Sequence, residues 1–167
     1  MSINKIAEKV GINISQVYRY FPNGKPDILV AIGNDRVQKG APDPALPKYQ
    51  DPKTLQIDLI KFYIRTHRES RKILASLQTV FLSYPDMMAQ DAQNVEAGAS
   101  DIKVLKTVLQ RYELEDSRIG EVTRVTFHLI DTMIHRQVLE IPITSTDEEL
   151  AYLLATIVES YVKGIKS

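Results

Sequence analysis

The sequence contains no cysteine, which excludes disulfide frameworks, thiolate metal sites and thiol nucleophiles. It has no apolar run near the ~18 residues of a membrane span, and no charged and apolar leader opens it. An HExxH pair, a glycine-rich phosphate loop and a Glu-x-x-His pair are also absent, so no motif supports an enzyme. We therefore expect a soluble, cytoplasmic, non-enzymatic protein that has no contact with membranes and no metal or other cofactor.

The composition is that of an ordinary globular protein, with 167 residues of which 44% are hydrophobic and 25% charged. This length favours one domain, or one core with a small appendage. The net charge is zero but is unevenly distributed, because residues 1–40 hold six basic and three acidic side chains while the remainder holds 15 and 18. A modestly basic N-terminal end suits nucleic-acid binding.

Period-two alternation is nearly absent and helical spacing recurs throughout, which predicts an all-α protein. A cluster of prolines divides a head at residues 1–40 from a body at residues 41–167, because proline interrupts helices. In the body we expect helices near residues 53–67, 70–84, 86–112, 116–139 and 147–163. Ser145 and Glu148 have the spacing of a capping box for the last of these helices.

The head has the sequence form of a helix-turn-helix, with helices predicted at residues 3–10, 14–20 and 26–39. Ser2 and Asn13 are placed as N-caps, Gly11 is placed as a helix stop, and Pro26 fits the first turn of the third helix. The inward stripe of the second helix is predicted from the apolar spacing of Ile14, Val17, Tyr18 and Phe21.

The opposite face of the second helix carries groups that bind nucleic acid. Ser15, Gln16, Arg19 and Tyr20 fall within an arc of about 140° when 100° is assigned to each residue. Hydroxyl, amide, guanidinium and phenol groups read base edges or bind phosphates. We expect Ser2 and Lys25, at the starts of the first and third helices, to contact backbone phosphates. Solvated helix faces and core aromatic residues are the structural alternatives for these positions.

The head resembles the DNA-binding signature of the TetR/AcrR family of transcriptional regulators over about the first 32 residues. The shared features are Ile6-Ala7, Gly11, Asn13, Tyr18-Arg19-Tyr20-Phe21, Lys25 and Ile28-Leu29. This resemblance implies that residues 14–19 form the recognition helix, that Tyr20 and Lys25 contact phosphate, and that Tyr18 partly packs and partly faces DNA. It also implies an all-α homodimer that binds a palindromic operator and is released, as a repressor, by a small molecule.

The sequence departs from the family because members usually carry one more helix before this motif, whereas Met1 falls almost at the supporting helix. The alternative hypothesis is therefore a dimeric ligand- or partner-binding protein that has lost DNA binding together with that first helix.

By the same resemblance, a small apolar or amphipathic effector would bind within the body. The predicted pocket residues are aromatic or adaptable side chains and one histidine: Phe62, Phe81, Tyr84, Met88 and His128. His128, Asp131 and His135 share one helix face, but their spacing favours polar lining of a pocket or a dimer seam over a metal site. His67 is expected to be a capping or surface residue.

The last two predicted helices carry apolar stripes suited to an interface between two copies. Pairing them with their copies would form a four-helix bundle across a two-fold axis. The predicted interface residues are Val122, Val125, Leu129, Met133, Leu150, Leu154, Ile157 and Tyr161.

Overall fold

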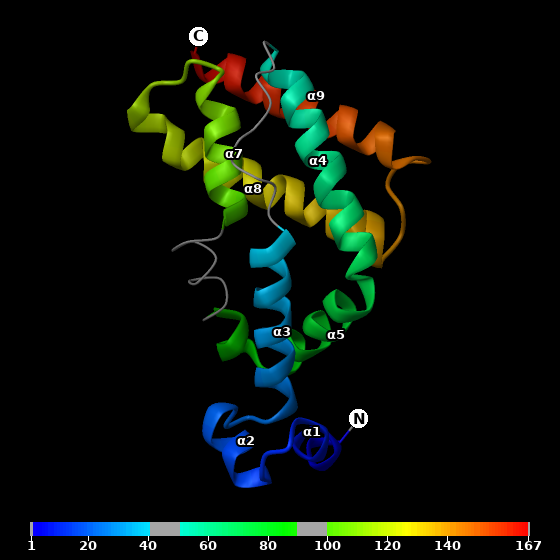
Figure 1. The fold of residues 1–167 in the computed structure, drawn as a ribbon. Coiled ribbons are helices and arrows are strands. Elements are labelled where there is room, and N and C mark those ends of the chain that lie inside the picture. Colours follow the sequence, from blue (N-terminus) through cyan, green and yellow to red (C-terminus); the bar gives the residue numbers. More distant parts are fainter. Residues whose placement is uncertain (1, 41–50, 90–99, 167) are drawn as a thin grey trace.

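Figure 1 shows the computed structural model of the chain, in which residues 2–40, 51–89 and 100–166 are described. All regular structure within these ranges is helical, which confirms the prediction of an all-α protein. None of the helices described is long and apolar enough to cross a membrane. The helices are α1 (Ile3–Val10), α2 (Ile14–Tyr20), α3 (Lys25–Gly40), α4 (Pro52–Glu69), α5 (Arg71–Ser83), α7 (Ser100–Gln110), α8 (Asp116–Leu139) and α9 (Asp147–Lys166).

Helices α1 and α2 are short and are joined by a three-residue turn. The predicted caps are present, since the Ser2 side chain accepts a hydrogen bond from the Lys5 amide and Asn13 caps α2. Gly11 adopts a left-handed φ of 74°, which favours glycine, and this conformation ends α1. Local sequence signals therefore determine both helices.

A tight turn at Phe21–Gly24 leads from α2 into α3. The Gly24 amide donates to the Phe21 carbonyl at 2.8 Å, and Gly24 has a positive φ of 71°. A Cβ atom at Gly24 would lie 2.7 Å from Cδ1 of Ile3, and the positive φ strains any other residue, so both observations favour glycine here. The turn thereby brings the residue just before α3 close to Ile3 of α1.

The main core forms where α4, α7, α8 and α9 pack together, in the upper part of Figure 1. Leu150, Leu154 and Val108 are completely buried in it, and each buried aliphatic side chain contributes about 1.5–3 kcal/mol. The α1–α2 unit lies at the opposite end of the elongated molecule, and α3 connects it to the rest (Figure 1). Helix α5 packs beside α3, so these two helices join the α1–α2 unit to the core.

One helix cap differs from the sequence-based expectation, and two predicted segments lie partly or mostly outside the described residues. The predicted helix 86–112 is helical at residues 85–89 and in α7, while residues 90–99 lie outside the described part of the chain. Most of the predicted proline boundary, at residues 41–50, also lies outside it. The capping box of α9 is formed by Thr146 and Glu149, one residue later than predicted, because the Glu149 amide donates to Thr146 Oγ1 at 3.1 Å. The Thr146 amide donates in return to the Glu149 carboxylate at 3.1 Å.

Candidate nucleic-acid interface

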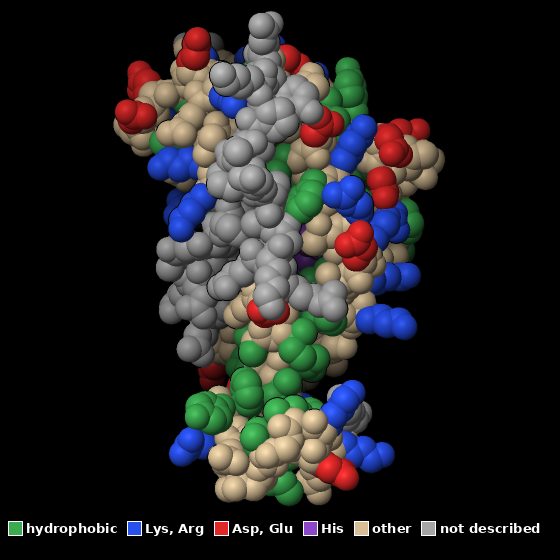
Figure 2. Space-filling model, viewed as in Figure 1, with side chains coloured by type: hydrophobic (Ala, Val, Ile, Leu, Met, Phe, Trp, Pro, Cys, Tyr) green, Lys and Arg blue, Asp and Glu red, His purple; other side chains and the backbone are tan. Residues whose placement is uncertain are grey.

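The outer face of α2 presents the polar side chains predicted for nucleic-acid contact. Ser15, Arg19 and Tyr20 are exposed, whereas Val17 is buried at 2% exposure and anchors the helix. Figure 2 shows basic side chains projecting from both flanks of this lower end of the molecule, where α1 and α2 lie. The helix therefore has one anchored side and one accessible polar side.

The inward stripe of α2 is narrower than predicted. Ile14 and Tyr18 are 42% and 47% exposed, and Phe21 is only half-buried. The reason is that the described part of the chain provides α2 with few packing partners beyond α1. The accessible side of α2 is thus partly apolar as well as polar.

Arg19 and Tyr20 form a pair at the end of α2. Nη2 of Arg19 donates to the Tyr20 hydroxyl at 3.0 Å, and the guanidinium carbon lies 5.0 Å from the centre of the Tyr20 ring. A cation over an aromatic ring gains a weak attraction, about 0.5–1 kcal/mol at exposed sites. The contact orders two long side chains, and it leaves the rest of the guanidinium fork accessible to an anion.

Asn13, Ser15 and Gln16 are engaged in capping α2. Oδ1 of Asn13 accepts from the Gln16 amide at 2.9 Å and from the Ser15 hydroxyl at 2.6 Å. Oε1 of Gln16 accepts in return from the Asn13 amide at 3.1 Å. These residues have a structural role, and Gln16 could use Oε1 to read a base only by breaking the capping box. Gln16 therefore caps α2 in addition to the base contact expected from its sequence position.

Ser2 and Lys25 are exposed on neighbouring segments of the same end. Ser2 caps α1, and Lys25 is the first residue of α3. Both predicted phosphate contacts therefore belong to helix starts, where orphan amides favour anions.

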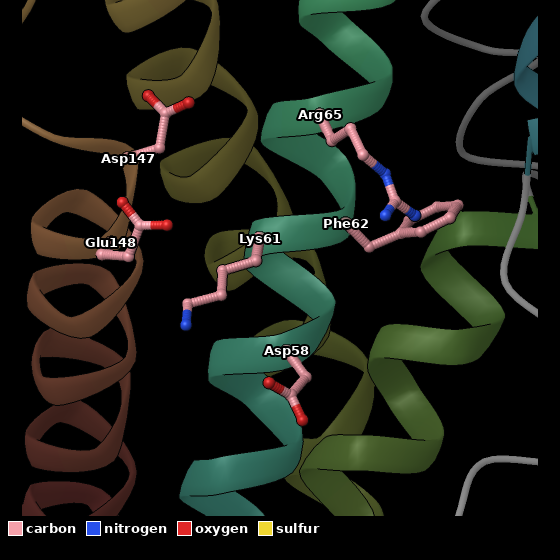
Figure 3. Close-up of a pocket in the computed structure, with 6 residues that line it drawn as sticks. All are labelled: Asp58, Lys61, Phe62, Arg65, Asp147 and Glu148. Carbon is pink, nitrogen blue, oxygen red and sulfur yellow. The ribbon is translucent and has the colours of Figure 1, made fainter.

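The predicted ligand pocket does not assemble as expected. Phe62 lines an open pocket between α4 and α9, together with Asp58, Lys61, Arg65, Asp147 and Glu148 (Figure 3). Phe81, Tyr84, Met88 and His128 do not line it; Phe81 is half-buried in α5 and the other three are exposed. Charged groups of both signs dominate this pocket, so it does not favour an apolar effector.

The predicted dimer residues divide into three groups by exposure. Val122, Leu150 and Leu154 lie in the core of the chain itself at 0–1% exposure, so they are not available to a second copy in this arrangement. Leu129 and Met133 are half-buried against the same core. Only Val125, Ile157 and Tyr161 are exposed, at 43%, 38% and 36%. The surface part of the predicted interface is therefore smaller than the sequence pattern suggested.

The histidines are arranged differently from the sequence-based expectation. His67 on α4 lies beside Asp131 and His135 on α8, whereas His128 is exposed outside this group. Burial and the neighbouring His67 lower the pKa of His135, although Asp131 opposes them, so this ring is neutral near pH 7. Burial raises the pKa of Asp131, but the surrounding histidines outweigh it and keep that pKa below its ordinary value. Sequence spacing on one helix gave no signal for the contribution of His67.

Comparison with known proteins provides no further guide to the function. No family model, no curated protein and no solved structure matches this chain. Resemblance to the TetR/AcrR family accordingly stays a prediction that depends on the residues of α1–α3 alone.

Proposed function

We propose that this protein is a DNA-binding transcriptional regulator that places α2 in the major groove. The observation that carries the proposal is the exposed Arg19–Tyr20 pair on a short helix whose opposite side is anchored by Val17. A helix of this diameter fits the major groove, and an arginine fork can pair with guanine or with phosphate. Lys25 and Ser2 would add contacts to the phosphate backbone.

The regulator would act as a homodimer on a palindromic operator. Two copies related by a two-fold axis would present their α2 helices to half-sites about one helical turn apart, roughly 34 Å. Residues exposed on α8 and α9 provide the pairing surface in this proposal. A small effector would release the repressor by favouring a different separation of the two α2 helices.

Fluorescence anisotropy tests the proposal with DNA from upstream of this protein's own gene and a scrambled duplex of equal length. We expect tighter binding to the upstream DNA, with an affinity that falls steeply as salt increases because phosphate contacts release counterions. Equal and weak binding to both duplexes across the salt series would contradict the proposal.

The alternative is a dimeric ligand- or partner-binding protein without DNA affinity. Exposed apolar residues of the α1–α2 unit favour it, since Val10, Ile12 and Ile14 are 64%, 37% and 42% exposed. An apolar surface of this kind suits a protein partner better than a phosphate backbone. The same anisotropy series distinguishes the two, because this alternative predicts no salt-dependent DNA binding.

A further inference from the structure

His67, Asp131 and His135 bring three ligand atoms together across the contact between α4 and α8. The three atoms lie within 4.8 Å of one another. Nε2 of His67 is 3.7 Å from Oδ1 of Asp131, and Nδ1 of His135 is 3.8 Å from Oδ2 of the same carboxylate. The two imidazole rings are also close, with their centres 4.9 Å apart.

These separations are too long for direct hydrogen bonds and suit ligands of one ion. A charge-assisted hydrogen bond would close to about 2.7–2.9 Å. Two ligands at about 2.0–2.1 Å from a tetrahedral ion are instead about 3.4 Å apart. Small side-chain movements would bring all three atoms to that spacing around a common centre.

The tautomer of His67 is set in the form that binds a metal. Its Nδ1 lies 2.8 Å from the Tyr63 carbonyl oxygen, and a carbonyl can only accept, so Nδ1 carries the proton. In the neutral ring the lone pair is therefore on Nε2, the atom that faces Asp131. Metal-binding histidines usually donate their second ring N–H to a carbonyl or carboxylate in this way, which fixes the ring and increases its basicity.

We propose that His67, Asp131 and His135 form a binding site for a divalent transition-metal ion such as Zn²⁺. Two imidazoles and one carboxylate form a ligand set of intermediate softness. Such a set suits zinc and other late first-row transition metals better than magnesium or calcium. Three protein ligands leave at least one coordination position for water or a small molecule. This inference follows from the α4–α8 contact alone and does not depend on the proposed DNA binding.

A titration of the tag-free full chain with Co²⁺, followed by displacement with Zn²⁺, tests the site. Visible d–d absorption of Co²⁺ reports the ligand field, and isothermal calorimetry with Zn²⁺ gives stoichiometry and affinity. The variants are His67→Gln, His135→Gln and Asp131→Asn, the last of which preserves the side-chain shape. His128→Gln is the matched control, because this exposed histidine is on the same helix as His135 but outside the cluster. Circular dichroism verifies that each variant keeps its helical content.

We expect one Zn²⁺ per chain, bound as tightly by His128→Gln as by the wild type. Loss of an outer-shell partner typically costs about 10–100-fold in metal affinity. Each variant of the three ligands should lose at least as much. Absence of stoichiometric binding would overturn the proposal. So would cluster variants, still folded, that bind Zn²⁺ as the wild type does, or a His128→Gln variant that loses binding equally.

Discussion

Leu77 occupies the space that a side chain on Gly33 would need, since a Cβ atom there would lie 2.6 Å from Cδ1 of Leu77. Glycine at this position allows α3 to lie directly against α5. Because α3 connects the α1–α2 unit to the core, this contact determines how firmly the proposed DNA-binding end is held.

Gly33→Ala is expected to lower the stability of the wild type but to raise the stability of a Leu77→Ala variant. Overpacking costs about 1–3 kcal/mol, while replacing a helical glycine with alanine gains about 1 kcal/mol. The net result in the wild type should be a loss of up to ~2 kcal/mol, whereas in a Leu77→Ala background only the gain of ~1 kcal/mol should remain. Urea denaturation of the four proteins measures this coupling.

Gly120→Ala is the matched control for the Gly33→Ala comparison. Gly120 is also helical, and a Cβ atom there would meet nothing within 4 Å. It should stabilise the protein by about 1 kcal/mol. Identical effects of Gly33→Ala with and without Leu77 would show that α3 and α5 are not in tight contact.

Protonation of Asp147 should weaken the junction between α4 and α9. Nε and Nη2 of Arg68 each donate to the Asp147 carboxylate at 2.6 Å. These hydrogen bonds lower the pKa of Asp147 below its ordinary value, although partial burial opposes the shift. A depressed folded-state pKa contributes stability that is present above the unfolded pKa and is lost as pH falls through the folded one.

Asp147→Asn should therefore cost stability at pH 6 and progressively less as the pH falls below about 4. The magnitude is at most about 1 kcal/mol, because Arg68 is about half exposed and the pair is screened by solvent. Thermal unfolding between pH 6 and pH 3 measures the difference between the two proteins. A difference that stays constant over this range would argue against the ion pair.

Removal of the α2 cap should loosen that helix even without any contact to DNA. Asn13→Ala deletes the acceptor for the Gln16 amide and should destabilise α2 by about 0.5–2 kcal/mol. Asn13→Ser keeps a capping oxygen and should retain most of the stability. Hydrogen exchange at the α2 amides compares the wild type with the Asn13→Ala and Asn13→Ser variants. Equal protection in all three proteins would exclude a capping role for Asn13.

A stripe on α9 provides the surface for the proposed dimer. Leu153, Ile157 and Tyr161 are spaced four residues apart, which places them on one helix face, and each is 36–40% exposed. Ile157→Glu should convert a wild-type dimer into a monomer in sedimentation velocity, because burying a carboxylate in an apolar seam is costly. Leu82→Glu on α5 is the control, since Leu82 is 80% exposed and outside the stripe. A monomeric wild type, or a variant that stays dimeric, would refute this interface.

The helix caps and stops were the features that the sequence predicted most reliably. Ser2, Gly11 and Asn13 act within one turn of the backbone, so their capping and stop roles could be predicted without tertiary structure. At α9 both Ser145–Glu148 and Thr146–Glu149 have the spacing of a capping box, and the structure uses the second pair, which spacing alone could not decide.

The spacing of residues along the sequence could not predict the tertiary contacts. Leu150 and Leu154 repeat with the period of an interface helix, but the same period serves the core of a single chain. His67 meets Asp131 only because α4 packs on α8, an arrangement that no local pattern encodes. The exposure of Tyr18 likewise depends on how many partners cover α2.

The most direct test of the central claim compares wild-type, Arg19→Ala and Arg124→Ala proteins on the same upstream duplex. Arg19 and Arg124 are both exposed arginines, but Arg124 is on α8, far along the chain from α2. If α2 enters the groove, only Arg19→Ala should weaken binding, by about 1–3 kcal/mol, which is roughly 5- to 150-fold in affinity. Equal affinity of all three proteins, or an equal loss in both variants, would contradict DNA recognition through α2.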